Sequence, residues 1–340
     1  MENVSLVILA SLTAALVLLP KWGLIARWRE SRRMTEKCRR EDALKYILKR
    51  EVNGQTPTLN GVAGALEIHS NKAAELLSEM ERRGLISFDC GQLRLRHAGR
   101  ELALHVIRAH RLWESYLADQ TGVEEAKWHH LAERKEHLMT PDEAEELSAR
   151  LGHPVRDPHG DAIPTVGEEL AADAGQSLNS APLNAVMQIE HIEDEPETVY
   201  AQLSAVGIRP GMRVCVFEKS PERIRFWADG QEHVLAPILA HNISVIPLPE
   251  SAGQDLFDEE FLAGLKPGQN ARILGLTTAC RGAERRRLLD LGFVPGTSIE
   301  VEMVSPGGDP TAYRVRGTLI ALRREQARLI RISTSEAQPL

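Results

Sequence analysis

The sequence predicts a multidomain α+β protein, with helices in its first half and two small β-barrels in its second. Its 340 residues favour two or three modules over one. Apolar residues recur at helical spacing as far as Arg150, whereas after Leu183 they form short runs separated by turns. The hydrophobic content of 43% is that of a folded protein and excludes wholesale disorder.

The first element is an apolar N-terminal segment, residues 1–26, which predicts a transmembrane anchor. Val4–Leu19 carries no charge, and the apolar stretch reaches Ala26 if Lys21 extends to the interface, giving the roughly 20 residues that a spanning helix needs. A basic juxtamembrane segment, residues 27–40, follows, so the positive-inside bias leaves all later domains in the cytoplasm. We therefore predict a single-pass protein of the inner or cytoplasmic membrane that contacts membrane lipid. A buried or interfacial helix is the alternative.

Residues 41–103 predict a winged helix-turn-helix, because three short helices and a hairpin follow one another in that order. A small helical module used only for protein contacts is the alternative. The expected elements are helices over Glu41–Arg50, Leu59–Leu66 and Lys72–Arg83, and strands over Leu85–Phe88 and Gln92–Leu95.

Two further helices, expected over Ala98–Gln120 and Glu124–Met139 within a domain at 104–165, each carry histidine and glutamate on one face. If the short connection makes them antiparallel, three imidazoles and three carboxylates converge. Such a nitrogen and oxygen donor set suits Mn²⁺, Fe²⁺ or Zn²⁺. A solvated face with ion pairs is the alternative. The residues are His110 and Glu114 on the first helix, and His129, Glu133, Glu136 and His137 on the second.

No catalytic set accompanies these residues. There is no HExxH motif for a zinc hydrolase, and four widely spaced cysteines argue against both a thiolate zinc site and an oxidising compartment. The net charge of −7 does not in itself indicate nucleic-acid binding, although the net charge of a whole chain can conceal a basic domain. We therefore predict a protein that is not an enzyme.

The second half contains an internal repeat, which predicts two SH3-like barrels at 183–248 and 261–333. The pattern that begins at Leu203 recurs at Leu288, a shift of 288 − 203 = 85 residues. The same shift sets Val234–Ala236 against Leu319–Ala321. The remaining segments are a linker at 166–182, an acidic linker at 249–260 and a tail at 334–340.

Two sets of short motifs in the chain match known families. The first set is Met80–Ile86, Gly99–Ala103, His110–Glu114, His129-x-x-x-Glu133-x-x-Glu136-His137, Leu151–Pro154 and Asp157–Gly160, and the second is Leu265–Gly268, Arg285–Gly292 and Gly317–Arg323. On the first set, residues 36–164 resemble the diphtheria-toxin-repressor and manganese-transport-regulator family of metal-dependent transcription factors. On the second, the two C-terminal repeats resemble FeoA-type domains, the second repeat more strongly than the first.

This resemblance implies a homodimer whose metal-bound form places two recognition helices on a palindromic double-stranded DNA operator. Glu133 and Asp42 stand where the iron branch has cysteine and methionine, so the harder donors resemble the manganese branch. Lys45 stands where that branch has a further carboxylate, which leaves a two-metal site incomplete. The implied ligands are Asp42, His110, Glu114, His129, Glu133, Glu136 and His137, and the residues expected at DNA are His69, Ser70, Asn71 and Lys72.

The function that follows is a membrane-tethered, metal-dependent DNA-binding transcriptional regulator of manganese or iron homeostasis. The alternative is a cytoplasmic metal-sensing subunit of a metal transporter, in which the winged helix serves only dimerisation. Two features favour the alternative. Ala74 cannot hydrogen-bond a base edge and Glu75 would face phosphates unfavourably. The ending Pro20–Leu24 resembles the last span of metal permeases that are fused to such regulators.

Overall fold

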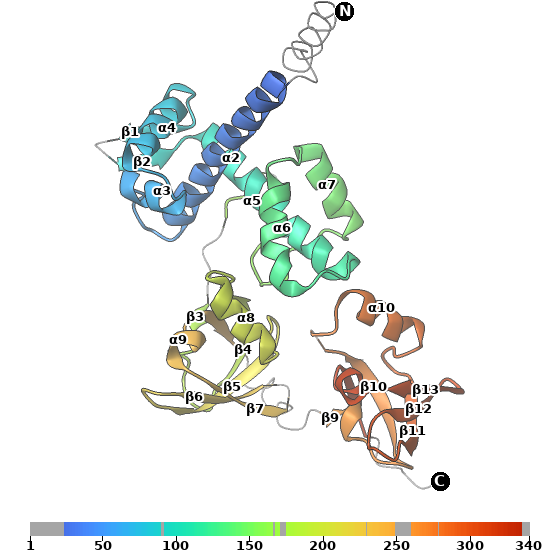
Figure 1. Ribbon diagram of the computed structural model, residues 1–340. Coiled ribbons are helices and arrows are strands. Elements are labelled where there is room, and N and C mark those ends of the chain that lie inside the picture. Colours follow the sequence, from blue (N-terminus) through green and yellow to red (C-terminus); the bar gives the residue numbers. More distant parts are fainter. Residues whose placement is uncertain are drawn as a thin grey trace, which may run out of the picture. The chain divides into compact units, whose positions relative to one another are not determined.

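The computed structural model describes residues 24–89, 92–165, 167–170, 175–228, 230–248, 260–277 and 279–334 (Figure 1). The predicted anchor lies outside these residues except for 24–26, as do nearly all of the acidic linker and the tail. Within the described ranges, no helix is both long and apolar enough to cross a membrane. The chain divides into two compact units, and α5 and α6 each contribute residues to both.

The first unit begins with a single long helix, α2, which runs from Leu24 to Val52. The basic segment at 27–40 is therefore part of the helix that also contains the predicted Glu41–Arg50. Neither glycine nor proline occurs between Leu24 and Val52, so nothing in the sequence interrupts the helix. It ends just before Gly54, whose φ of +67° suits glycine.

The winged helix follows as the sequence predicts. Helices α3 (Leu59–Ala65) and α4 (Ser70–Arg82) precede the antiparallel strands β1 (Ile86–Asp89) and β2 (Gln92–Leu95). Thr58 caps α3 by accepting a hydrogen bond from the Gly61 amide at 3.0 Å. The residues buried together in its core are Ala43, Leu44, Ile47 and Leu48 of α2 with Val62, Ala73, Leu77, Met80, Ile86 and Leu93.

Three helices complete the helical part of the chain: α5 (His97–Gln120), α6 (Trp128–Glu136) and α7 (Pro141–Arg150). The predicted helix over Glu124–Met139 is shorter than expected, because its first turn is a 3-10 helix and its last residues form a turn. Thr140 then caps α7, accepting from the Glu143 amide at 3.2 Å while Glu143 accepts from the Thr140 amide at 2.8 Å.

The second unit contains two β-rich domains with the same topology. The sheet of the first has the order β3-β8-β4-β5-β6-β7, and that of the second β9-β14-β10-β11-β12-β13, with all neighbouring strands antiparallel. The first contains β3 (Gln176–Ser177), β4 (Val186–Ile192), α8 (Glu197–Ala205), β5 (Arg213–Lys219), β6 (Ile224–Ala228), β7 (Gln231–Leu235), α9 (Pro237–Ala240) and β8 (Ile243–Pro247). The second contains β9 (Glu260–Phe261), β10 (Asn270–Leu276), α10 (Gly282–Asp290), β11 (Ser298–Val304), β12 (Thr311–Val315), β13 (Thr318–Leu322), α11 (Arg324–Ala327) and β14 (Ile330–Ser333).

Two predictions for the second half of the chain need correction: the spacing of the repeat and the extent of the linker before it. The shift is 85 residues from α8 to α10 and from β5 to β11, but the turn before β12 is two residues longer than the turn before β6, so later elements are shifted by 87. Buried Leu235 therefore corresponds to buried Leu322 rather than to Ile320. The predicted linker at 166–182 also extends too far, because Leu178 and Ala181 are fully buried in the first β-domain.

Candidate metal centres

The first cluster of candidate ligands, called the first centre here, lies in the first unit and consists of Asp42, His110, Glu136 and His137. Candidate donor atoms of Asp42, Glu136 and His137 all lie within 4.8 Å of one another. His110 joins them through its Nδ1, which is 2.5 Å from Oε2 of Glu136. Asp42 comes from α2, His110 from α5 and Glu136 from the last residue of α6, and His137 directly follows that helix.

Three charged side chains adjoin the first centre: Lys37, Glu41 and Lys45. Lys37 lies 3.6 Å from Glu41 and donates to the His137 carbonyl at 2.5 Å. Lys45 of α2 donates to both carboxylate oxygens of Glu136, at 2.7 and 3.0 Å. Glu41, one turn before Lys45, lies 2.7 Å from Nδ1 of His137, whose Nε2 is 3.2 Å from Asp42. Helix α2 reaches the centre because its apolar residues pack into the winged-helix core while Glu41, Asp42 and Lys45 project beyond it.

The electrostatics of the first centre follow from these contacts. Burial alone would raise the pKa of Glu136, but hydrogen bonds and charges from His110 and Lys45 outweigh it and lower that pKa. Burial alone would lower the pKa of His137, but hydrogen bonds to Asp42 and Glu41 raise it to about 9. The centre thus favours ionised carboxylates and attracts positive charge, whether a proton or a cation.

A second cluster, the second centre, lies in the second unit and consists of Glu114, His129, Asp157, His159 and Asp194. Candidate donor atoms of Glu114, Asp157 and His159 lie within 4.8 Å of one another. Nδ1 of His129 is 3.5 Å from Glu114 and 2.9 Å from Asp194. Nδ1 of His159 is 3.4 Å from Glu114 and 4.0 Å from Asp194. The ligands come from α5, α6, the loop after α7 and the loop after β4.

The loop at 157–160 is fixed by its own backbone. Oδ1 of Asp157 accepts from the amides of His159 and Asp161, both at 2.9 Å. Gly160 has a φ of +96°, and a Cβ there would lie 1.9 Å from the carbonyl oxygen of Glu190 on β4. The loop can therefore lie against the first β-domain only with glycine at this position.

Burial and neighbouring charges compete in the second centre, and burial prevails at Asp157 only. It raises the pKa of Asp157 to about 7, with the charge of Asp161 adding to the effect. Burial would lower the pKa of His159, but a hydrogen bond to Glu114 and the surrounding carboxylates raise it to about 9. Burial would raise the pKa of Asp194, but His129 and His159 lower it instead. These buried carboxylates need a positive partner, which either a protonated imidazole or a cation provides.

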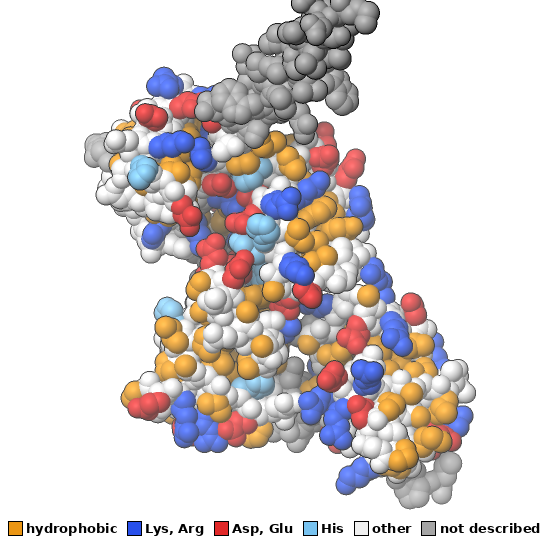
Figure 2. Space-filling model, in the orientation of Figure 1, with side chains coloured by type: hydrophobic (Ala, Val, Ile, Leu, Met, Phe, Trp, Pro, Cys, Tyr) orange, Lys and Arg blue, Asp and Glu red, His pale blue; other side chains and the backbone are white. Residues whose placement is uncertain are grey.

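The structure brings together six of the seven ligands that the sequence implies. Asp42, Glu136 and His137 lie in the first centre together with His110, whose Nδ1 is 2.5 Å from Glu136, and Glu114 and His129 lie in the second. Figure 2 shows histidine and acidic side chains grouped on the surface of the helical part. Glu133 is exposed on α6 and is not among the described residues whose donor atoms group together.

Sequence reasoning missed Asp157, His159 and Asp194. The sequence predicts a loop at Asp157 and His159, although both belong to a matching motif. A His-x-Glu-Asp-Glu run surrounds Asp194, in a segment whose pattern predicts only a β-barrel. Both segments contain ligand-type residues in a local run, which is the signal that was present. Because both segments lie far from α5 along the chain, spacing alone does not show that their side chains join those of α5.

The predicted DNA-reading residues, His69, Ser70, Asn71 and Lys72, are all exposed around the N-terminus of α4. Glu75 is exposed on the same helix, whereas the Ala74 side chain is partly buried. The face thus presents three polar groups and one lysine to a ligand, together with an acidic group.

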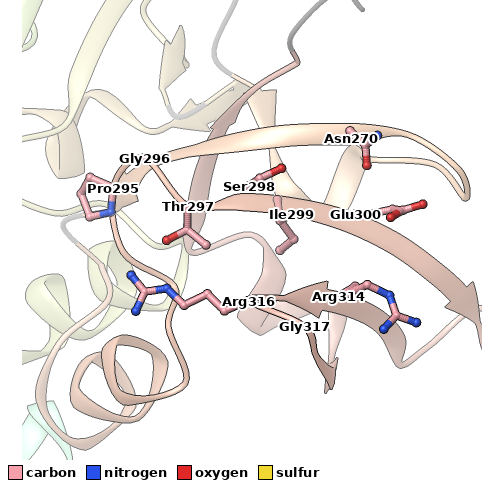
Figure 3. Close-up of a pocket in the computed structure, with 10 residues that line it drawn as sticks. All are labelled: Asn270, Pro295, Gly296, Thr297, Ser298, Ile299, Glu300, Arg314, Arg316 and Gly317. Atoms are coloured by element: carbon pink, nitrogen blue, oxygen red, sulfur yellow. The ribbon is translucent and has the colours of Figure 1, made fainter.

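The second β-domain also contains a shallow pocket beside β11 and β12 (Figure 3). Arg314 and Arg316 contribute to its lining together with Asn270 and Glu300. Arg314 is paired with Glu302 at 2.9 Å. With two arginines in its lining, the pocket has the wrong charge for a cation.

A winged helix followed by a helical domain with buried His/carboxylate clusters defines the class of metal-responsive DNA-binding proteins. Residues 96–165 match the family "Iron dependent repressor, metal binding and dimerisation domain", and residues 262–334 match the FeoA domain. The iron-dependent repressor IdeR of Mycobacterium tuberculosis (strain H37Rv) is 31% identical over 217 residues, which cover 59% of this chain and 94% of that protein. The chain therefore belongs to the IdeR and diphtheria toxin repressor family of metal-dependent repressors, as the sequence predicts.

Three further similarities are to a second repressor of this family, to a solved repressor structure and to a membrane protein of a metal transport system. The diphtheria toxin repressor of Corynebacterium diphtheriae is 30% identical over 213 residues, covering 59% of this chain and 94% of that protein. A solved manganese-dependent transcriptional repressor in complex with manganese has the same fold, with a TM-score of 0.56 and 24% identity over 61% of this chain and 99% of that one. A "Probable metal transport system membrane protein" of Chlamydia trachomatis (serovar D) is 41% identical over 83 residues, which cover 24% of this chain and 18% of that protein. The family members named here are repressors, in line with the prediction that this chain is not an enzyme.

Proposed function

We propose that this chain is a metal-dependent transcriptional repressor that senses Mn²⁺ or Fe²⁺ and binds a palindromic DNA operator as a homodimer. The observation that carries the proposal is the first centre, where buried Glu136 meets two imidazoles and a carboxylate from α2. This donor set has no thiolate and suits Mn²⁺ or Fe²⁺, and it also accepts Zn²⁺. A bound divalent cation supplies the positive charge that these carboxylates require.

The route from metal to DNA runs through α2. Asp42 and the core residues Leu44 and Ile47 belong to the same helix. A metal ion that holds Asp42 in place would therefore also hold the winged helix in place, through its core. Glu136 and His137 anchor the other side of the centre at the end of α6. Joining these helices orders the unit that carries α4, which lowers the entropy that DNA binding would otherwise cost.

The second centre gives the first β-domain a role in this proposal. Asp194 follows β4, and its carboxylate lies 2.9 Å from His129 of α6. Tyr200 of α8 lies edge-on to His159, with ring centroids 4.8 Å apart. A cation bound here would be held jointly by the helical ligands and the β-domain, so we propose that this FeoA-type domain stabilises the metal-bound form.

The decisive test is DNA selection with the 340-residue chain, with and without Mn²⁺ or Fe²⁺, combined with metal analysis of the same protein. We expect enrichment of an inverted repeat only when metal is bound, with affinity that falls steeply as salt increases. The matched control is the Glu136→Gln variant, which should enrich no sequence at any metal concentration. Recovery of the same sequences without metal would contradict a metal-dependent repressor.

We also propose that the chain is tethered to the inner or cytoplasmic membrane through residues 1–26, with its folded domains in the cytoplasm and its basic segment at membrane lipid. The apolar sequence of residues 1–26 supports this proposal. Fractionation of cells that produce the chain, before and after removal of residues 1–26, tests it. Recovery of both forms in the soluble fraction would contradict it.

The 83-residue similarity to a metal transport membrane protein favours a second candidate function, a metal-sensing subunit of a transporter that does not bind DNA. In that case a permease should co-purify with the chain after nuclease treatment, and transport should lose its control by metal in Glu136→Gln. No operator should be enriched. The selection experiment therefore separates the two functions.

A further inference from the structure

Lys45 is a cation built into the first centre. It lies on α2, three residues after Asp42, and its ammonium group contacts both oxygens of Glu136 at 2.7 and 3.0 Å. Only 1% of the Glu136 side chain is exposed, against 26% for Lys45. A long side chain therefore enters from the surface and places its charge on the most buried carboxylate of the centre.

The charges around the first centre leave room for one divalent ion. Glu41, Asp42 and Glu136 bring three negative charges when ionised, Lys45 brings one positive charge, and Lys37 brings a second, 3.6 Å from Glu41. With neutral imidazoles at His110 and His137 the net charge is minus one, which a single divalent cation already offsets. Buried charge is costly unless it is compensated, so a second divalent ion would leave the cluster with a large excess of positive charge.

The position of Lys45 matters as much as its charge. Two ions that share a carboxylate usually each take one of its oxygens, but Lys45 already holds both oxygens of Glu136. We propose that Lys45 acts as a tethered cation that limits the first centre to one divalent ion and weakens the affinity for that ion. This rests on the proposed function, since it concerns the same metal centre.

The proposal is tested with Mn²⁺ in the full chain carrying Glu114→Gln, which removes a ligand of the second centre. In this parent, Lys45→Met removes the charge at similar length, and Lys45→Glu adds a carboxylate in its place. Lys49→Glu, one turn further along α2 and exposed, is the matched control for a charge change on the same helix. The bound Mn²⁺ is measured by equilibrium dialysis with elemental analysis, and its electron paramagnetic resonance spectrum is recorded.

We expect one Mn²⁺ per chain with a six-line spectrum in the parent and in Lys49→Glu. Lys45→Met should also bind one ion, but about tenfold more tightly, because a like charge about 3 Å from the shared carboxylate is gone. Lys45→Glu should bind two ions, with loss of six-line intensity as neighbouring ions couple. If Lys45→Glu does not fold, the Mn²⁺ affinity of Lys45→Met alone tests the proposal.

Several outcomes would overturn the proposal: two ions in the parent, a single uncoupled ion in folded Lys45→Glu, or unchanged affinity in Lys45→Met. Glu136→Gln in the same parent distinguishes this failure from that of the proposed function. If Glu136→Gln retains the Mn²⁺, the first centre is not a metal site and both proposals fail. If it loses the ion while the Lys45 variants behave as the parent, only the role of Lys45 is wrong.

Discussion

The two centres are built from similar side chains but in different ways. The first takes its ligands from helices α2, α5 and α6 and includes a lysine on its central carboxylate. The second takes ligands from two helices, a loop and a β-domain, and Nε of Arg111 lies 3.8 Å from its Asp157. The first is thus suited to control the winged helix directly, and the second to join a β-domain to helical residues. Metal-ligand variants can test whether the two roles are separate.

The largest effect should come from Glu136→Gln. An uncharged amide cannot compensate Lys45 or bind a divalent ion as a carboxylate does, so the first centre should lose metal affinity by about a hundredfold or more. Metal-dependent DNA binding should disappear, while one ion per chain remains at the second centre. Isothermal titration with Mn²⁺ and a gel-shift assay measure the two effects. Loss of both ions together would show that the centres are not separate.

Glu133→Gln is the matched control on the same helix. It tests a residue for which the sequence and the structure give different predictions. The resemblance to the manganese branch implies that Glu133 is a ligand, whereas the structure leaves its side chain exposed and outside both centres. We expect metal and DNA affinities within about twofold of the unmodified chain. A loss as large as that of Glu136→Gln would mean that Glu133 moves into the centre when metal binds.

Asp194→Asn should have a smaller, local effect. The variant removes a buried charge 2.9 Å from His129, so the second ion should bind about tenfold more weakly while the first centre is unchanged. Glu195→Gln is the control, since 64% of that side chain is exposed. The dissociation constant of the second ion, measured in a Glu136→Gln background, checks the prediction. Equal effects of the two variants would contradict a ligand role for Asp194.

The metal-free protein should become less stable as pH rises, and the first centre should contribute through His137. Its pKa is raised from 6.5 to about 9, so its stabilising effect is fully present below pH 6.5 and is lost as pH rises through 9. After allowance for solvent screening, the loss is on the order of 1–2 kcal/mol. His159 acts in the same direction in the second centre.

Thermal unfolding in chelator at pH 6 and pH 9.5 tests this prediction. The unfolding temperature should fall with pH, and His137→Gln should reduce the difference. His105→Gln is the control, because His105 contacts the Met139 carbonyl at 3.0 Å but no carboxylate of the first centre. A pH dependence that is unchanged in His137→Gln would place its origin elsewhere.

The difference between the centres also shows how far sequence reasoning could reach. Helical spacing placed Glu136 and His137 on one face of a helix, and the fold of the winged helix followed from its apolar pattern. Spacing could not show that Glu133, one turn earlier, stays exposed, because the direction of a face depends on what packs against it. Asp194 was beyond prediction, since its place beside His129 depends on how a loop of a distant β-domain lies.

A smaller effect, confined to DNA binding, should come from a variant of α4, which contributes to neither centre. Lys72 is exposed in the first turn of α4, where a contact to phosphate would displace counterions without reading a base. Lys72→Ala should weaken binding of all DNA sequences alike and reduce the slope of log affinity against log salt by about 1. Glu75→Gln on the same helix should instead strengthen binding slightly, because it removes a charge that repels phosphate. If neither variant changes the salt dependence of metal-dependent binding, α4 does not face the DNA, and the first centre must control a different surface.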